Sequence, residues 1–349
     1  MPSISSDFLI RDFLFASAAA FVLCFPVRVI LEHLQVLDRP NERSSHSAPV
    51  VRGGGIAILL SVFLVGGFEL DRSQGSAIIT IAVAGLMLAA VSFMDDLRSL
   101  GQTIRFSVQS GAAFIAVVVL LRGDMHGCGA ISKAAFGLIG FLWITGYTNS
   151  FNFMDGINGI AGMQTVVCGL GTALIGIVAG ARTDNSAVIA SVILAGAGAG
   201  FLPHNFPRAR LFLGDVGSAP IGFLLAVIGF WIARDLGWWL LGAFGLLHAN
   251  FVLDSLITLL RRVILGERWY ESHREHFYQR LVRSGASHVL VATWEGSIQI
   301  VVLLVLLSAV RMGWMFRGFA AGMVFILWLA FFCFAEYRFR HQKFGAART

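Results

Sequence analysis

Charged residues are scarce in this chain: Asp, Glu, Lys and Arg make up only 13% of its 349 residues, whereas 57% are hydrophobic. A mean hydropathy of +0.78 excludes an ordinary soluble domain. Apolar runs of about 20 residues, the length of a membrane-spanning helix, recur along the chain and leave no room for a separate soluble domain. We therefore expect a single transmembrane domain over residues 1–349, all-α in fold class.

Cysteine is equally sparse, and its distribution excludes a disulfide framework. Of the four cysteines, Cys24, Cys168 and Cys333 lie within apolar runs, which leaves Cys128 alone in a loop. The first apolar run has no small-residue cleavage pattern, so we expect a retained helix rather than a cleaved signal. Glycine, in contrast, is abundant with 39 residues, which favours close helix packing in lipid.

Hydropathy predicts about eleven transmembrane helices, or ten if the short fifth segment does not cross. They lie near residues 8–31, 53–70, 76–94, 105–121, 134–149, 160–180, 186–202, 216–233, 237–260, 292–311 and 317–337. An odd number of crossings places the two termini on opposite sides of the membrane.

Basic residues set the expected orientation, because cytoplasmic loops carry an excess of Lys and Arg. Eighteen of the 26 Lys and Arg residues fall in alternate connections and at the C-terminus. We therefore expect an inner-membrane protein with its N-terminus outside, its C-terminus cytoplasmic, and cytoplasmic loops near 32–52, 95–105, 149–159, 203–217 and 261–291. Because the unusual polar residues lie in the same loops, a soluble anionic substrate from the cytosol is indicated.

Four aspartates stand at the ends of apolar runs on this face: Asp95, Asp96, Asp155 and Asp215. Ionisable groups near hydrocarbon are costly and usually mark function. Asp95 and Asp96 repel each other, so one keeps a raised proton affinity unless a cation lies between them, which suits a base or a metal site. A solvated helix end is the alternative. Arg105 and Gln109 follow at helical spacing and could orient a phosphate.

The segment from Asn149 to Gly159 is the densest polar run in an apolar neighbourhood. Its Asn and Asp oxygens are hard ligands of the kind Mg²⁺ prefers, and Gly156 and Gly159 let the backbone turn close to a ligand. A loop that merely connects two helices is the alternative.

Asp215 opens the predicted eighth helix, between glycines and after Arg208 and Arg210. An aspartate that caps a helix is ordinary. The nearby arginines favour function, and free backbone amides at this helix start could hold phosphate oxygens.

The last large loop contains His273, Arg274 and His276 among aromatic residues, a surface suited to sugar stacking and phosphate contacts. Two alternatives remain open. One is a zinc site, which lacks a third clear ligand, and the other is an amphipathic segment on the membrane surface.

Two further features are less specific. The loop that contains Arg43 leads to three glycines, Gly53–Gly55, which suit either function or close helix packing. Asp254 lies within the predicted ninth helix, where it either reaches the site or pairs inside the bundle, and we favour the second.

In this order along the chain, the motifs resemble those of the polyprenyl-phosphate N-acetylhexosamine-1-phosphate transferase family, which includes the phospho-N-acetylmuramoyl-pentapeptide transferase. The resemblance covers most of the chain. It implies that Asn152 and Asp215 bind Mg²⁺, with Mn²⁺ as the alternative ion, and that Asp95 and Asp96 lie at the catalytic centre. It further implies that Asp155 lines the nucleotide pocket and that the last loop binds the nucleotide-sugar through His273, Arg274 and His276. We also expect substrate-binding residues outside this set: Asn149, Arg105, Asn158 and Arg43.

The reaction implied is transfer of a sugar-1-phosphate from a UDP-amino sugar to undecaprenyl phosphate, with release of UMP, which initiates a cell-surface polysaccharide. The sequence His-Arg-Glu-His replaces the consecutive histidines of the peptidoglycan enzyme, so the chain looks more like the surface-polysaccharide branch. No nucleic-acid partner is expected, and a homodimer is compatible with the sequence. The alternative function is a lipid-phosphate transporter or flippase, which would need ionisable groups along a path across the membrane.

Overall fold

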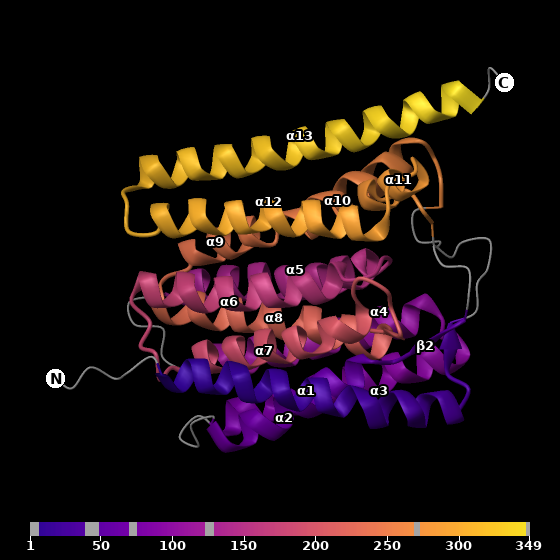
Figure 1. The fold of residues 1–349 in the computed structure, drawn as a ribbon. Helices are drawn as coiled ribbons and strands as arrows, with labels where there is room; N and C mark the ends of the chain where they lie inside the picture. Colours follow the sequence, from indigo (N-terminus) through magenta and orange to yellow (C-terminus); the bar gives the residue numbers. More distant parts are fainter. Residues whose placement is uncertain (1–6, 39–48, 70–74, 123–128, 269–272, 347–349) are drawn as a thin grey trace.

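Each predicted apolar segment contains a helix in the computed structural model, which describes residues 7–38, 49–69, 75–122, 129–268 and 273–346. The helices are α1 (Asp7–His33), α2 (Gly55–Glu69), α3 (Gly75–Arg98), α4 (Gln102–Leu121), α5 (Ala130–Met154), α6 (Ile160–Ala179), α7 (Ser186–Asn205), α8 (Asp215–Leu236), α9 (Trp239–Leu247), α10 (Ala249–Ile264), α11 (Phe277–Arg283), α12 (His288–Ala309) and α13 (Trp314–Ala346). The long helices run roughly side by side in a bundle (Figure 1).

Within the described residues, nine helices are long and apolar enough to span a membrane, and the α9–α10 pair makes a tenth if it counts as one span. The remaining predicted segment, α2, has 15 residues and is shorter than this criterion. The protein is therefore a polytopic, mostly helical membrane protein. α1 starts at one end of the bundle and α13 finishes at the other (Figure 1).

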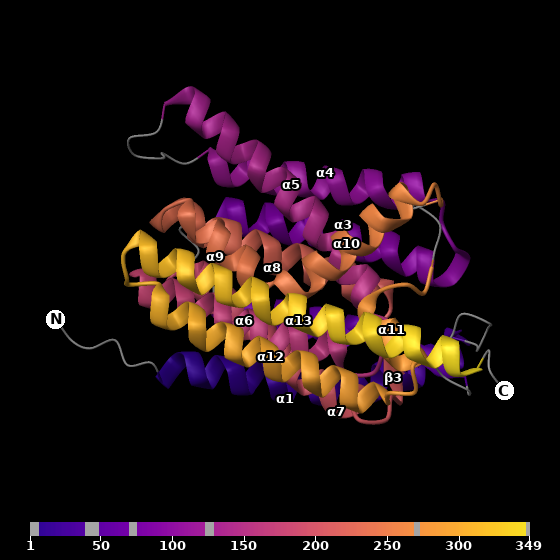
Figure 2. The ribbon, with the colours of Figure 1, turned by 90° about the horizontal axis from the view of Figure 1, so that it is seen from above.

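Helix α8 forms the centre of the bundle and is almost entirely buried (Figure 2). Small residues let other helices of the bundle, such as α1 and α7, approach each other closely. On α7, a Cβ atom added to Gly196 or Gly200 would lie 2.4 or 2.1 Å from a backbone carbonyl oxygen of α1. Such contacts replace the hydrophobic driving force that is missing between helices in lipid.

The prediction of one continuous helix over 237–260 is wrong, because the chain bends by 79° between α9 and α10. His248 lies at the bend, with its Nδ1 2.6 Å from the carbonyl oxygen of Phe244. Asn250, two residues later, bonds to Gln164 on α6 and to Glu295 on α12. Side chains that bond into or away from the helical ladder are a recognised cause of kinks.

The all-α prediction also missed a small sheet formed by β1 (Leu37–Asp38), β2 (Val50–Arg52) and β3 (Leu211–Phe212). β1 pairs with β2 antiparallel, and β2 pairs with β3 in parallel, with Val51 opposite Leu211. This sheet ties the end of α1 to the chain entering α2 and α8, at the same end of the bundle as the loops that contain the predicted site.

Of the two roles considered for Gly53–Gly55, function or close helix packing, the structure supports helix packing. A Cβ atom on Gly55 would lie 2.0 Å from the Cα atom of Gly217. The starts of α2 and α8 can therefore touch only because both positions lack a side chain.

Candidate active site

Three helix ends and one strand bring the acidic residues of the predicted site together. Asp95 and Asp96 lie in the last turn of α3, α8 begins at Asp215, and Asp155 directly follows α5. The guanidinium of Arg52, at the end of β2, lies between two of these carboxylates: its Nε is 2.8 Å from Asp96 Oδ1 and its Nη2 is 2.7 Å from Asp215 Oδ1. Burial alone would lower the pKa of Arg52, but the nearby carboxylates of Asp215 and Asp96 outweigh this effect. The pKa is therefore raised above its usual value, and the guanidinium stays protonated.

Asp96 supports the first turn of α8. Its two carboxylate oxygens accept hydrogen bonds from the backbone amides of Asp215 and Val216, each at 3.0 Å. The next two amides, of Gly217 and Ser218, donate to the carbonyl oxygen of Gly214. The expectation that free amides at this helix start could hold phosphate oxygens is therefore wrong, because a carboxylate from α3 already takes the two outermost amides.

Asp95 faces different partners from its neighbour Asp96. Its Oδ2 lies 2.9 Å from Nη1 of Arg105, and its Oδ1 accepts a 2.5 Å hydrogen bond from the backbone amide of Leu100. The same Nη1 of Arg105 lies 3.7 Å from Asp215 Oδ2. Asp95 and Asp96 therefore pair with different arginines, and Arg105 links Asp95 to Asp215.

The polar run predicted as a loop is partly helical, because α5 continues to Met154. Thr148 and Asn149 donate side-chain hydrogen bonds to the carbonyl oxygens of Ile144 and Thr145, so their polar groups are accommodated within the helix. Asn152, in the last turn, accepts a 2.5 Å hydrogen bond from the hydroxyl of Ser218 on α8. This bond joins two of the predicted motifs.

Asp155 lies where α5 ends, close to Asp215. Desolvation, followed by the negative charge of Asp215, raises the pKa of Asp155 to about 7. Asp155 therefore holds a proton more readily than an ordinary aspartate, unless another cation approaches.

Asn205 has a role that the sequence did not reveal. Its Oδ1 accepts a hydrogen bond from the backbone amide of Gly159 at 2.7 Å, and its Nδ2 donates to the carbonyl oxygen of Leu211 at 3.0 Å. Nearby, Asn158 donates to the carbonyl oxygen of Pro207 at 3.3 Å. The turn after α5 is thus fastened to the segment that leads into α8. An asparagine at the end of a buried helix was the only available signal.

The last loop contains the short helix α11, whose residues Phe277, Tyr278 and Leu281 are buried. α11 is therefore packed into the protein rather than lying on the membrane surface. The ring of His276 lies 5.0 Å from that of His273, and its Nδ1 is 2.9 Å from Asp254 Oδ1. Burial, and then His276, lower the pKa of His273 to about 4, so this ring is neutral at physiological pH.

Arg274 stands between these histidines, and its carbonyl oxygen accepts a hydrogen bond from Arg283 at 3.0 Å. Arg43 and Cys128 lie outside the described residues.

The donor atoms at the centre fit a magnesium ion. Among the three aspartates of the centre that pair with arginine, the side chain of Asp215 is the most open, with 19% exposed, against 6% for Asp95 and none for Asp96. Within the described part of the chain, no three acidic, histidine or cysteine side chains form a metal cluster. Mg²⁺ commonly takes only one or two carboxylates and completes its shell with substrate phosphates and water. Asp215, with the amide oxygen of Asn152, is a donor set of this kind.

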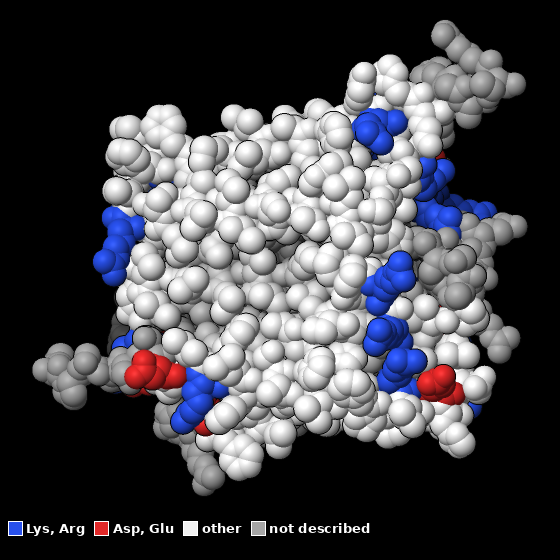
Figure 3. Space-filling model, in the orientation of Figure 1, with Lys and Arg blue, Asp and Glu red and all other residues white. Residues whose placement is uncertain are grey.

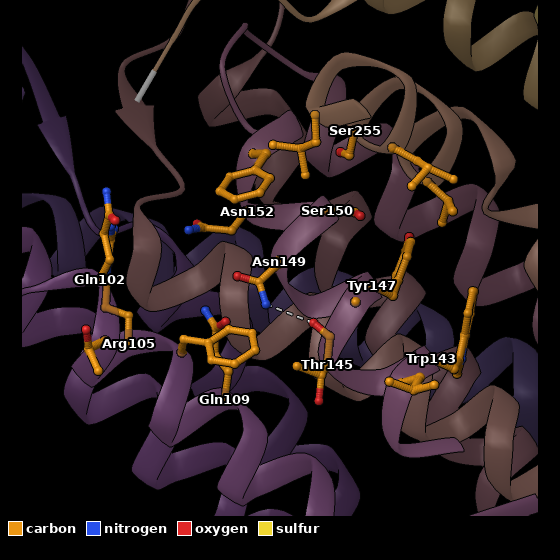
Figure 4. Close-up of a pocket in the computed structure, with 18 residues that line it drawn as sticks. Gln102, Arg105, Gln109, Trp143, Thr145, Tyr147, Asn149, Ser150, Asn152 and Ser255 are labelled. Carbon is orange, nitrogen blue, oxygen red and sulfur yellow. Dashed lines mark hydrogen bonds between the residues drawn. The ribbon is translucent and has the colours of Figure 1, made fainter. Parts of the chain in front are cut away.

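A pocket of about 640 Å³ lies beside the acidic centre, between α4, α5 and α10 (Figure 4). Gln102, Arg105 and Asn152 lie toward one end of it, and Trp143 and Tyr147 toward the other. Three buried polar atoms on its lining residues have no hydrogen-bond partner, on Gln109, Thr145 and Ser255. Most of the exposed lining surface is apolar, but the pocket also presents unsatisfied polar groups and has polar side chains toward one end.

Basic residues gather at the end of the molecule that holds these elements. In the orientation of Figure 1 they line the right-hand side of the surface, around the loops next to β2 and α11 (Figure 3). A positive surface next to an acidic centre attracts anionic ligands while the arginines at its edge balance the carboxylates.

Comparisons with known proteins show the family to which the chain is similar. Residues 78–233 match the model of glycosyl transferase family 4. A decaprenyl-phosphate N-acetylglucosaminephosphotransferase of Mycobacterium tuberculosis (strain CDC 1551 / Oshkosh) is 30% identical over 308 residues, which cover 78% of this chain and 76% of that protein. A probable undecaprenyl-phosphate N-acetylglucosaminyl 1-phosphate transferase of Bacillus subtilis (strain 168) is 27% identical, over 81% of this chain and 80% of that protein.

An undecaprenyl-phosphate alpha-N-acetylglucosaminyl 1-phosphate transferase of Thermotoga maritima is 26% identical, over 75% of this chain and 79% of that protein. The matched family segment runs from α3 through α8, which contains all four aspartates of the acidic centre. The chain belongs to glycosyl transferase family 4.

Proposed function

We propose that this protein transfers the sugar-1-phosphate of a UDP-N-acetylhexosamine to undecaprenyl phosphate on the cytoplasmic face of the inner membrane. The products are undecaprenyl-diphosphate-sugar and UMP, and the reaction initiates a cell-surface polysaccharide such as O-antigen, capsule or a cell-wall polymer. The relatives named above carry polyprenyl-phosphate N-acetylglucosamine-phosphate transfer in their names, which supports the reaction class. The excess of basic residues around the site supports a cytoplasmic position.

The observation that carries the proposal is the pocket beside the acidic centre. Its apolar surface, to which Trp143 and Leu256 contribute, suits an isoprenoid chain, and Arg105 toward one end of it suits the phosphate of the same lipid. Arg105 also contacts Asp95 and lies near Asp215. A lipid phosphate bound there would lie next to the carboxylates where a soluble nucleotide can arrive.

In the proposed reaction, an oxygen of the lipid phosphate attacks the β-phosphorus of the UDP-sugar. A phosphorus–oxygen bond forms, and the bond from that phosphorus to the oxygen shared with the uridine phosphate breaks, so UMP leaves with the electron pair. The lipid phosphate is already a nucleophile at neutral pH, so placement and charge neutralisation matter most.

We assign Asp95, through its contact with Arg105, to orient the lipid phosphate. Asp96 is its partner and holds α8. Asp215 and Asn152 would hold Mg²⁺, which, when bound, neutralises charge on the pyrophosphate. Asp155 and the His273–His276 segment line the donor side in this assignment, with Arg274.

The test is an assay of UMP release from purified protein in detergent with undecaprenyl phosphate, Mg²⁺ and a panel of UDP-amino sugars, beginning with UDP-N-acetylglucosamine. Release that requires both the lipid and a UDP-sugar is expected. Folded protein that releases no UMP from any donor would refute the proposal and return attention to a transporter.

Two variants assign the roles of the carboxylates. Asp95→Asn and Asp215→Asn should each lower turnover at least ~100-fold, which corresponds to about 2.7 kcal/mol of activation free energy. Normal turnover in either variant would contradict that residue's assignment. Exchange of labelled UMP into UDP-sugar without lipid would indicate a covalent aspartyl-phosphate route rather than direct transfer.

A further inference from the structure

Asp254 is a fully buried carboxylate on α10, and it gathers four hydrogen-bond donors from two parts of the chain. The donors are the Thr258 hydroxyl at 3.2 Å, His276 Nδ1 at 2.9 Å, and the backbone amides of Phe277 at 3.1 Å and Tyr278 at 3.3 Å. Three of these four groups belong to the start of α11. A buried carboxylate with this many donors has its hydrogen-bonding capacity satisfied. Because three of the donors come from the start of α11, these bonds fix the position of α11.

The contact with His276 also determines which ring nitrogen carries a proton. A carboxylate oxygen only accepts, so Nδ1 of His276 donates to Asp254. In the neutral ring this leaves Nε2 as an acceptor. The orientation and hydrogen-bonding character of His276 therefore depend on a residue 22 positions earlier, on a helix that also lines the lipid pocket.

Tyr278 connects the start of α11 to the turn that contains Asp155. Its hydroxyl donates to the carbonyl oxygen of Phe153 at 3.1 Å. A Cβ atom on Gly156 would lie only 2.0 Å from that hydroxyl oxygen, so the turn rests directly on the tyrosine. The backbone amide of Tyr278 is one of those that Asp254 holds, which makes a continuous path from α10 to the turn.

We infer that Asp254 is a positioning residue for the donor side of the site: it fixes His276 directly and, through Tyr278, the turn that carries Asp155. This inference rests on the proposed function for the identity of the ligand, a nucleotide-sugar. The next residues of α10, Ser255 and Leu256, line the lipid pocket. α10 thus presents one substrate's pocket and supports the other substrate's loop.

Kinetics give the first test, with Asp254→Asn, which keeps the shape and one acceptor oxygen. We expect the KM for the UDP-sugar to rise about tenfold, because misplaced binding groups weaken capture, while the KM for undecaprenyl phosphate stays unchanged. The matched control is Thr258→Val, which removes one donor to the same carboxylate without touching α11 and should behave as wild type. Equal rises in both KM values, or none, would refute the inference.

A double variant separates positioning from general damage. If Asp254 acts partly through His276, Asp254→Asn combined with His276→Ala should cost less than the product of the two single effects. Effects that multiply in full would show that the two residues act independently, which contradicts the inference.

Hydrogen exchange gives a test that needs no activity. In Asp254→Ala, the amides of residues 277–283 and of the turn at 153–159 should exchange faster, while α6 and α7 keep their protection. Loosening of α11 without the turn would refute the link through Tyr278. Loosening of both in a protein that releases no UMP would leave the positioning role intact while the proposed function fails.

Discussion

Asp96, at the end of α3, accepts a hydrogen bond from the backbone amide of Asp215, at the start of α8, across 3.0 Å. The two aspartates also share the guanidinium of Arg52. Asp96 thus stabilises the first turn of α8, which is a platform for the side chain of Asp215. This division of labour separates residues whose loss should weaken the fold from those whose loss should affect only the chemistry.

Asp96→Asn should therefore destabilise the protein, because an amide offers only one acceptor oxygen to two backbone amides and no charge to Arg52. Hydrogen bonds to a charged group contribute about 1.5–3 kcal/mol, so we expect a loss of roughly 2 kcal/mol. Thermal unfolding in detergent measures it. Asp184→Asn, at the exposed pair with Arg182, is the matched control and should change stability little. Equal effects of the two substitutions would contradict the platform role of Asp96.

Arg52→Gln should make the stability of the protein more dependent on divalent cations. Without the guanidinium, the carboxylates of Asp96 and Asp215 lose their shared cation and repel each other. Added Mg²⁺ should raise the unfolding temperature of this variant more than that of wild type. Arg182→Gln, which removes an exposed arginine, should respond as wild type does. A magnesium response unchanged by the Arg52 substitution would show that the ion does not bind at these carboxylates.

Gly146→Leu should obstruct the lipid pocket without disturbing the helix. Gly146 lines the pocket on α5, and a Cβ atom there meets nothing within 4 Å. Leucine favours a helix more than glycine does, so the fold should persist. We expect a higher KM for undecaprenyl phosphate and an unchanged KM for the UDP-sugar. Gly111→Leu on α4 is the matched control, since its Cβ position is equally open and it does not line the pocket.

His273 should make the folded state less stable as the pH falls. Its pKa is lowered from 6.5 to about 4, chiefly by burial, so below pH 6.5 the unfolded chain takes up a proton that the folded protein does not. The contribution is present above pH 6.5 and is lost between about pH 6.5 and 4. Unfolding temperatures of wild type and His273→Gln should therefore diverge over this range. His341→Gln, at an exposed histidine, is the control, and parallel curves for wild type and His273→Gln would contradict the prediction.

The helices and the clustering of acidic residues at one end were predictable because they follow from local patterns. Apolar runs locate the spans, and Asp95, Asp96 and Asp215 stand where such runs meet polar segments. Asn152 and Ser218 belong to separate motifs whose contact could only be guessed from their shared end of the bundle. The structure adds the 2.5 Å bond between them.

Features that depend on long-range contacts were not predictable. Nothing in the sequence around Arg52 shows that it lies between Asp96 and Asp215, and nothing around Asp254 shows that it holds the start of α11. The sheet of β1, β2 and β3 escaped notice because its strands are two or three residues long and pair across the chain. The bend at His248 is accompanied by hydrogen bonds from Asn250 to α6 and α12, partners that only the folded bundle supplies.

The pairing of β2 with β3 has a consequence for how the protein is made. Val51 is synthesised early and pairs on one side with Leu37 of β1, but its partner on the other side, Leu211, follows only after α7 has been completed. Arg52 reaches its place only when that pairing forms and α8 begins. A chain that ends before residue 211 would therefore contain helices α1 to α7, six of which are long and apolar enough to span a membrane, yet it would lack an assembled acidic centre.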